Sequence, residues 1–426
     1  MFIVKKTLII ANLVLASTLS SVASAAEVPA ELNKSFLEAL KTRDSGDVYA
    51  SIALLEKLIA AQPQFKRAEL ELAVAYYRAA LYAESKAYAE SVMADPSTPN
   101  NVKETVDLFL NQLVAEQEAA DENRHRFSGS ITLGGGRDNN VNASPASDVV
   151  NINGLTFVLE DGSSAQEDGY GTVNLLGEHS YAMPGTVGIG SRPVQTEWST
   201  SVNFYRKAYA ELNDYNLNVA TLSTGINFIS TTDWRASLAA RIDKVTLGAN
   251  DLGIFKGING SYTKVDGVNE YTFSASLTGR EFDSVANEGR DGVASSLSVQ
   301  ALHQFDSAVT GKIGVGLEFL DAKAENKQNV TKSWNAGLYY ASTPNFLIYG
   351  EIDTKFADYD GVEAVYGIDR DETIFSSSLG VSYSFVEGSM ADWKLNGRIN
   401  GTNNSSNISI YEYSKTDISV DLTKQF

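Results

Sequence analysis

The stretch Glu270–Phe282, EYTFSASLTGREF, alternates apolar or small side chains with polar ones. One face carries Tyr271, Phe273, Ala275, Leu277 and Gly279, and the other carries Thr272, Ser274, Ser276, Thr278 and Arg280. Successive side chains of a β-strand point to opposite faces, so a period of two predicts a strand with one apolar and one polar side.

The same alternation recurs from Arg126 to Phe426. Fourteen segments are predicted to be strands: 127–135, 169–182, 194–206, 214–229, 234–247, 252–264, 269–282, 292–305, 309–321, 331–342, 345–357, 372–387, 391–401 and 413–426. Most exceed the roughly 9–11 residues with which a tilted strand crosses a bilayer. None of the eight prolines falls in these segments, as expected where pairing needs every backbone N–H. We therefore expect a transmembrane antiparallel β-barrel of about 14 strands over residues 126–426.

The predicted connections alternate between short turns and longer polar loops. The short turns lie at Ser230–Asp233, Asp266–Gly267, Asp306–Ser307 and Thr343–Pro344. The longer loops lie at 283–291, 322–330, 358–371 and 402–412, and the longest, 136–168, follows the first strand. This arrangement is typical of a bacterial outer-membrane barrel, with the short turns on the periplasmic side. An even number of strands puts both ends of the barrel segment on that side.

Aromatic residues and the last strand agree with a membrane location. Trp198, Trp234, Trp334 and Trp393 lie close to predicted strand starts, where an interfacial girdle of aromatic side chains belongs. In the C-terminal strand, one face carries Ile418, Val420, Leu422 and Phe426. An alternating last strand that ends in Phe resembles the signal read by the barrel assembly machinery. Outer-membrane lipids and that machinery are therefore expected partners.

Residues 1–25 are predicted to be a secretory signal peptide. Lys5 and Lys6 precede an apolar run, Thr7–Leu19, and the small residues Ala23–Ala25 form an A-x-A cleavage site. A retained membrane anchor is the alternative, but the apolar run is short for a bilayer span. Export predicts an outer-membrane barrel whose N-terminal domain lies in the periplasm.

Residues 26–125 are predicted to form helices, because they are rich in Ala, Leu, Glu and Lys and poor in Gly. Pro63 and Pro96 each end a helix and stand 33 positions apart, which resembles the 34-residue tetratricopeptide (TPR) period. A fifth helix would cap the stack. Leu72, Tyr76 and Tyr77 are candidates for a client-binding groove, or simply belong to the repeat core. A plain helical bundle is the alternative to a TPR-like domain.

Composition argues against several function classes. A net charge of −19 disfavours nucleic acid as a partner, and the lack of cysteine excludes disulfides and thiolate chemistry. The three histidines, His125, His179 and His303, have no metal-binding spacing. No catalytic, metal or cofactor site is expected, so the chain is predicted not to be an enzyme.

Two polar patterns are expected to have ordinary roles. Asp138-x-Asn140-x-Asn142 resembles half of a calcium loop, but the expected glycine and glutamate are Ala143 and Val149, which favours a polar loop start. A second pattern, Glu351, Asp353 and Lys355, alternates with apolar residues and is expected to face the lumen.

Two TPR-like units followed by about 14 strands resemble the Slam family, the surface lipoprotein assembly modifiers. The best local match is Gly134–Pro145, GGGRDNNVNASP, where the family places a glycine-rich D-x-N-x-N stretch. The resemblance implies a translocator that moves a client, a surface lipoprotein or a secreted soluble protein, from the periplasm to the cell surface. The rival predictions are a diffusion channel or porin and a polysaccharide export pore.

Overall fold

The computed structural model describes residues 30–152, 155–160, 162–230 and 233–426. The predicted signal peptide, residues 1–25, lies outside the described residues. The chain forms two compact units. One contains the N-terminal helices together with Tyr181–Glu197 and the end of strand β7 (Leu217–Ser230), and the other contains the remaining strands. The change from helix to strand occurs between Glu122 and His125, next to the boundary predicted at residue 126.

The helical unit contains five described α-helices, none of them long and apolar enough to cross a membrane. They are α2 (Ala30–Asp44), α3 (Val48–Ala61), α4 (Lys66–Arg78), α5 (Tyr82–Ala94) and α6 (Asn100–Glu122). Gly46 adopts a φ of +93° in the α2–α3 turn, a conformation that glycine accepts without steric cost. As predicted, α3 and α5 end just before Pro63 and Pro96.

The helices repeat with a period of 34 residues. The Ser51 hydroxyl donates to the Ala39 carbonyl at 2.7 Å, and the Ser85 hydroxyl, 34 positions later, donates to the Ala73 carbonyl at the same distance. Buried positions continue the period into the last helix, as in the pairs Leu72 and Val106, Ala75 and Phe109, and Ala79 and Leu113. Each repeat consists of two helices, α2 with α3 and α4 with α5. Helix α6 corresponds to the first helix of a third repeat, and its apolar stripe packs against α5.

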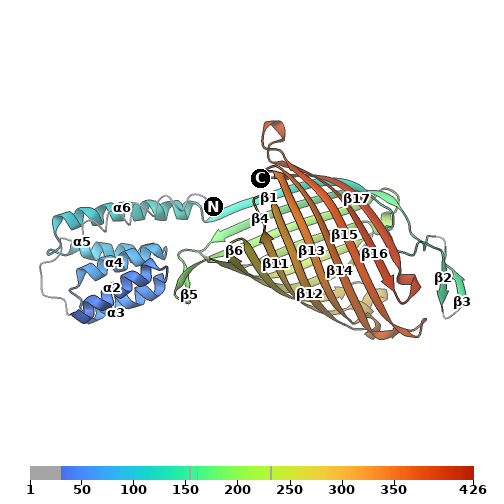
Figure 1. The fold of residues 1–426 in the computed structure, drawn as a ribbon, viewed down its shortest axis with the longest axis horizontal. Coiled ribbons are helices and arrows are strands. Elements are labelled where there is room, and N and C mark those ends of the chain that lie inside the picture. Colours follow the sequence, from blue (N-terminus) through green and yellow to red (C-terminus); the bar gives the residue numbers. More distant parts are fainter. Residues whose placement is uncertain (1–29, 153–154, 161, 231–232) are drawn as a thin grey trace. The chain divides into compact units, whose positions relative to one another are not determined.

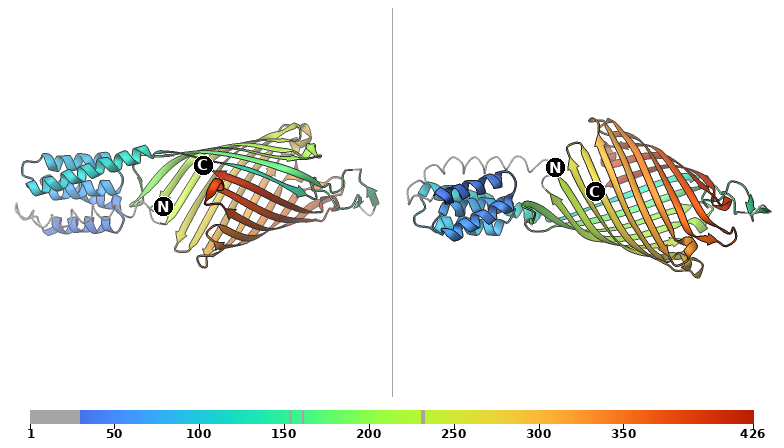
Figure 2. Two further views of the ribbon diagram at one scale, coloured as in Figure 1. Left: turned by 90° about the horizontal axis from the view of Figure 1, so that it is seen from above. Right: turned by 60° about the horizontal axis from the view of Figure 1, so that its bottom comes forward.

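The second unit is a closed antiparallel barrel (Figures 1 and 2). All fourteen predicted strands are present: β1 (His125–Asp138), β4 (Asp168–Ala182), β6 (Arg192–Tyr209), β7 (Leu217–Ser230), β8 (Trp234–Leu247), β9 (Asn250–Asp266), β10 (Asn269–Phe282), β11 (Gly292–Gln304), β12 (Val309–Ala322), β13 (Asn329–Thr343), β14 (Phe346–Glu363), β15 (Ile368–Ser384), β16 (Trp393–Ser406) and β17 (Tyr413–Gln425). Each strand pairs with its neighbours in sequence, and β1 pairs with β17 to close the ring.

Three short strands were not predicted. The hairpin β2 (Val149–Ile152) and β3 (Leu155–Val158) lies in the loop between β1 and β4, at one end of the barrel (Figure 1). Strand β5 (Val187–Ile189) pairs with the start of β6. Pro193, expected outside the strands, lies in this extension opposite Gly188.

Several connections are shorter than predicted because the strands run further. The loop expected at 358–371 is a short turn, since β14 reaches Glu363 and β15 begins at Ile368 after a register shift between Asp358 and Val362. β16 likewise extends into the segment 402–412. Trp234 and Trp393 begin their strands as predicted, but Trp198 and Trp334 are the seventh residue of β6 and the sixth residue of β13 and do not mark strand starts.

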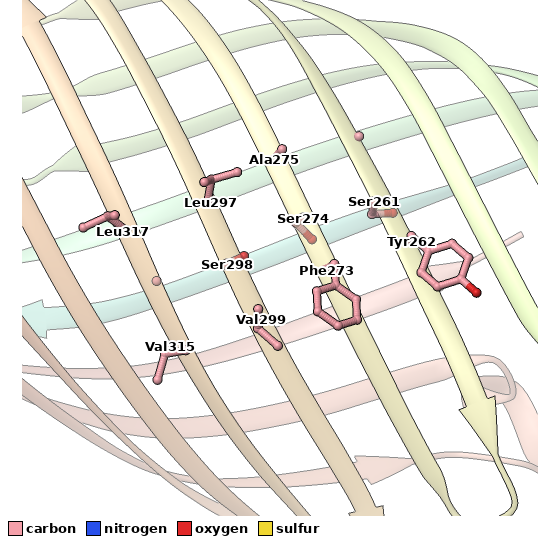
Figure 3. Close-up of a pocket in the computed structure, with 12 residues that line it drawn as sticks. Ser261, Tyr262, Phe273, Ser274, Ala275, Leu297, Ser298, Val299, Val315 and Leu317 are labelled. Atoms are coloured by element: carbon pink, nitrogen blue, oxygen red, sulfur yellow. The ribbon is translucent and has the colours of Figure 1, made fainter.

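The outer face of the barrel is apolar. Figure 3 shows large side chains of β9 to β12 gathered around a shallow depression over Ala275. Leu297 is 59% exposed and Phe273 is 50% exposed, values that water would penalise and lipid would not. Because a closed barrel satisfies its backbone hydrogen bonds without an open edge, it can present such a surface to a bilayer. The chain is therefore an outer-membrane β-barrel with a helical N-terminal region.

Candidate functional site

The luminal face combines two kinds of wall. On β8 to β11 it carries pairs of small hydroxyls that bond to each other across the strands, at 2.7–2.9 Å: Ser237 with Ser261, Thr263 with Thr272, and Ser276 with Ser296. The wall around β1, β4, β6 and β17 carries charged and tyrosine side chains instead. The small hydroxyls leave room for a passing solute, and the second wall is where specific contacts are built.

Asp138, the last residue of β1, is fully buried at the centre of the charged wall. Its Oδ2 accepts from Lys415 Nζ at 2.7 Å, from Lys207 Nζ at 3.3 Å and from the Tyr209 hydroxyl at 3.0 Å. A buried carboxylate without such partners would be costly. The three donors come from β6 and β17, so Asp138 ties β1 to strands on both sides.

A second carboxylate, Asp417 of β17, extends this cluster. Its Oδ1 accepts from the Tyr170 hydroxyl at 2.8 Å, and its Oδ2 lies 3.6 Å from Lys207 Nζ. The same Lys207 ammonium lies 3.8 Å from the centre of the Tyr170 ring, a cation–π contact. We call the set Asp138, Tyr170, Lys207, Tyr209, Lys415 and Asp417 the seam cluster.

Gly136 makes the Tyr170 contact possible. A Cβ at this position would lie 2.5 Å from the Tyr170 hydroxyl oxygen and would also overlap the Ile418 carbonyl. Only a residue without a side chain lets the tyrosine of β4 cross over β1 and reach β17. The glycine-rich start of the GGGRDNN motif therefore has a packing role.

The D-x-N-x-N motif is a polar loop start, as the sequence analysis favoured. Asn140 Nδ2 donates to the carbonyls of Ser144 and Ser414, at 2.8 and 3.0 Å. Asn142 Nδ2 donates to the Ser164 carbonyl at 2.8 Å, and its Oδ1 accepts from the Gln166 N–H. The motif oxygens are thus occupied by protein donors, and no group of three metal-ligating residues occurs in the described part of the chain.

A smaller luminal cluster lies on β12 to β14. Lys312 Nζ lies 2.5 Å from Glu351 Oε1, and the Tyr339 hydroxyl donates to the same oxygen. Ile352, the next residue along β14, is 37% exposed on the outer face. Glu351 therefore faces the lumen as predicted, and Asp353 and Lys355 share its face by strand alternation.

The seam between the first and last strands runs in register from Ser130 opposite Gln425 to Asp138 opposite Asp417. Backbone bonds between Gly129 and Phe426 continue it to the C-terminus. Ile418, Val420 and Phe426 are exposed on the outer face, and Leu422 shares their parity along β17. Their role as an assembly signal remains a prediction.

Comparison with known proteins adds the following. No protein-family model matches the sequence, and no curated protein does. Among solved structures, a FadL homologue of Pseudomonas aeruginosa is 11% identical, covering 71% of this chain and 90% of its own, with a TM-score of 0.37. Pseudomonas aeruginosa OprD is 12% identical, covering 70% and 95%, with a TM-score of 0.36. A BenF-like porin of Pseudomonas fluorescens Pf-5 is 10% identical, covering 70% and 99%, with a TM-score of 0.35.

The three predicted groove residues do not line one groove. Leu72 is fully buried in the core formed by α2, α3 and α4, so it belongs to the repeat core, the alternative given above. Tyr76 packs beside it, with its hydroxyl 2.5 Å from Glu56 of α3 and its ring stacked on Tyr88 of α5. Tyr77 packs in a second hydrophobic core, formed by α4, α5 and α6, against Phe109 of α6.

The hydroxyl groups of Tyr76 and Tyr77 both have a raised pKa. Burial, and then the Glu56 carboxylate, raise the pKa of Tyr76. Burial, and then Glu116, raise the pKa of Tyr77 to about 12. Both are therefore neutral donors at physiological pH. The half-exposed Tyr76, Tyr88 and Glu56 form an aromatic–acidic surface on the helical unit.

A feature missed by the sequence analysis is the docking of the hairpin Ala182–Arg192 on the helices, within the same unit. The Tyr49 N–H donates to the Ser191 carbonyl at 2.9 Å, and the Tyr49 hydroxyl donates to the Thr186 carbonyl at 2.5 Å. The Thr186 hydroxyl donates to the Ala79 carbonyl at 2.6 Å, at the end of α4. Asp47 accepts from the Ser191 hydroxyl at 2.6 Å. The turns after α2 and after α4 thus both hold the hairpin.

Proposed function

We propose that this protein is an outer-membrane translocator that moves a client protein from the periplasm to the cell surface or the medium. One observation carries the proposal: the unit of repeated helices includes the connection between two strands of the barrel, held through Tyr49 and Asp47. A repeat unit that presents an extended surface is suited to holding a polypeptide, and its attachment to a strand connection suits delivery to the barrel.

The resemblance to the Slam family supports the same proposal. The 34-residue period of Ser51 and Ser85 is the TPR period, and fourteen strands follow the helices. By that resemblance the client is a surface lipoprotein or a secreted soluble protein. No catalysis is needed: the helices hold or guide the client, and the barrel offers a passage or a lateral opening.

The client contact is assigned to the aromatic–acidic surface of Tyr76, Tyr88 and Glu56, with Tyr77 beside it. Half-exposed aromatic rings supply contact area at low entropic cost, and the Tyr88 hydroxyl can donate to a client backbone. The seam cluster has the matching role in the barrel. A lateral opening between β1 and β17 would have to break the Asp138 and Asp417 contacts at the loop-bearing end first.

Comparison of the surface-shaved, secreted and periplasmic proteomes of wild-type and deletion strains tests the proposal. We expect one or a few proteins to leave the outside and accumulate in the periplasm. Matching proteomes in all three fractions would contradict translocation.

A diffusion channel is the second candidate, and the wall of paired small hydroxyls on β8 to β11 favours it. The paired hydroxyls are polar and carry no charge, which suits the passage of small solutes. Swelling of liposomes that contain the purified protein, in small sugars or organic acids, tests this function. Rapid swelling together with unchanged proteomes would favour the channel over the translocator.

A further inference from the structure

A recess of about 480 Å³ opens on the luminal face of the charged wall. Its lining includes Tyr170, Tyr205, Lys207, Arg398, Asn400 and Asp417, from β4, β6, β16 and β17. The volume falls in the range of small-ligand pockets, roughly 300–1,000 Å³. The recess lies within the barrel unit.

Arg398 differs from the other cations of this wall. Among the described residues its side chain forms no ion pair and no hydrogen bond, and it is exposed to the lumen. Lys207 and Lys415, in contrast, are both bonded to Asp138. A guanidinium carries five N–H donors in a planar fork, so Arg398 offers these donors to whatever occupies the recess.

The acids near Arg398 are already engaged. Asp138 and Asp417 belong to the seam cluster, and Asp421 accepts from Asn396 Nδ2 at 2.7 Å. Glu351 is held by Lys312. Among the described residues, therefore, none of these acids forms an ion pair with Arg398.

Two neutral side chains of the recess, Tyr205 and Asn400, can also donate hydrogen bonds to a ligand. Within the part of the chain that the structure describes, neither the Tyr205 hydroxyl nor the Asn400 amide bonds to another protein group. Both are half-buried. Together with Arg398 they provide convergent donors, which is the chemistry that recognises an oxyanion.

We infer that the recess binds a carboxylate group, with Arg398 as the principal contact and Tyr205 and Asn400 as further donors. Arg398, Lys207 and Lys415 balance Asp138, Asp417 and Asp421, so the site favours a singly charged carboxylate over a doubly charged phosphate. The group could be a small organic acid or the acidic side chain of an unfolded polypeptide. The inference holds for either cargo of the barrel.

Arginine modification tests this site on the full-length protein in detergent micelles. Phenylglyoxal reacts with accessible guanidiniums, and peptide mass spectrometry follows Arg398 separately from Arg280, which is paired with Glu318 at 3.2 Å. We expect Arg398 to react faster than Arg280. A ligand at about ten times its dissociation constant leaves about one tenth of the sites free, so acetate at that level should slow Arg398 about tenfold.

Two further arms identify the source of the carboxylate and the other donors. A ten-residue glutamate-rich peptide is compared with its glutamine counterpart and with acetate: protection by the peptide at lower concentration indicates a polypeptide, and protection by acetate alone indicates a small acid. In the variants Tyr205→Phe and Asn400→Ala, the modification of Arg398 by phenylglyoxal can still be measured. Each variant should weaken the protection of Arg398 by acetate. Heat-modifiable electrophoretic mobility checks that each variant is folded.

The inference is overturned if Arg398 reacts no faster than Arg280. It is also overturned if chloride at matched ionic strength protects Arg398 as well as acetate and the acidic peptide do. Stronger protection by phosphate than by acetate would contradict the choice of a carboxylate.

Discussion

The Tyr170 hydroxyl donates a 2.8 Å hydrogen bond to Asp417, although strand β1 separates the two strands that carry these residues. The ring crosses β1 at Gly136, where no side chain obstructs it. The closing pair of the barrel, β1 and β17, is therefore held on its luminal side as well as by its backbone ladder. Several predictions about assembly and transport depend on this contact and on its neighbour, Asp138.

Replacing Asp138 with alanine should destabilise the barrel strongly. Lys207 and Lys415 would lose their shared partner in a buried position, and the loss of one partner of a buried ion pair typically costs about 3–5 kcal/mol. The temperature at which the folded band disappears in heat-modifiable electrophoresis should fall. Asp358→Ala removes an exposed pair with Lys332 and should change that temperature little, because exposed pairs contribute about 0–1 kcal/mol. Equal effects of the two variants would contradict the role of Asp138.

Gly136→Ala should impair assembly. The new methyl group would meet the Tyr170 hydroxyl and the Ile418 carbonyl, and a backbone carbonyl in a paired strand has little freedom to move. Gly177→Ala in β4 is the matched control, because nothing lies within 4 Å of a Cβ there. The measured quantity is the folded fraction in outer-membrane preparations. A folded fraction as high for Gly136→Ala as for the control would show that the close approach is not needed.

Ser51→Ala and Ser85→Ala should weaken the helical unit by similar amounts. Each change removes one buried hydrogen bond to a carbonyl of the preceding helix, worth about 0.5–1.5 kcal/mol. The urea concentration that allows proteolysis of the helices in the full-length protein should fall for both. Thr42→Ala, at an exposed position, serves as the control. Very different effects of the two serine variants would count against their equivalence in the repeat.

The hairpin contact should weaken at low pH. The Ser191 hydroxyl, and then Ser45 and Arg192, hold the pKa of the Asp47 carboxyl below its usual 3.8, against the opposing effect of desolvation. A lowered pKa means that this stabilisation is fully present above pH 3.8 and is lost as the pH falls through the lowered value. Exchange protection of the Tyr49 N–H, which donates to Ser191, should decline over that interval. In Asp47→Asn the protection should not follow this titration, and a decline identical to the wild type would contradict the assignment.

Much of the barrel could be predicted from sequence because its information is local. Alternation in segments such as 270–282 fixes which side chains face lipid, and all fourteen strands follow from it. Strand ends were less predictable, because polar residues continue β14 to Glu363 beyond the apolar band. Trp334 was placed close to a strand start for the same reason: β13 begins at Asn329, two residues before the predicted start at residue 331.

The seam cluster and the hairpin contact could not be predicted because they depend on distant residues. Asp138 was visible as the start of a polar loop, but nothing near it in sequence indicates Lys207 or Lys415. Tyr49 and Thr186 are 137 positions apart and meet only once the hairpin has formed. Leu72 and Tyr76 lie four residues apart on α4, and a sequence period alone does not say whether such a stripe faces a groove or a core.

The most direct test of the central claim separates the helices from the barrel in a deletion strain. The strain carries either the full chain or a chain without residues 26–122, and the surface-to-periplasm ratio of each exported protein is measured. Heat-modifiable mobility confirms that both barrels are assembled. We predict that the full chain restores the client to the surface and that the assembled barrel without helices leaves it in the periplasm. Equal restoration of the client to the surface by the full chain and by the assembled barrel without helices would contradict the account.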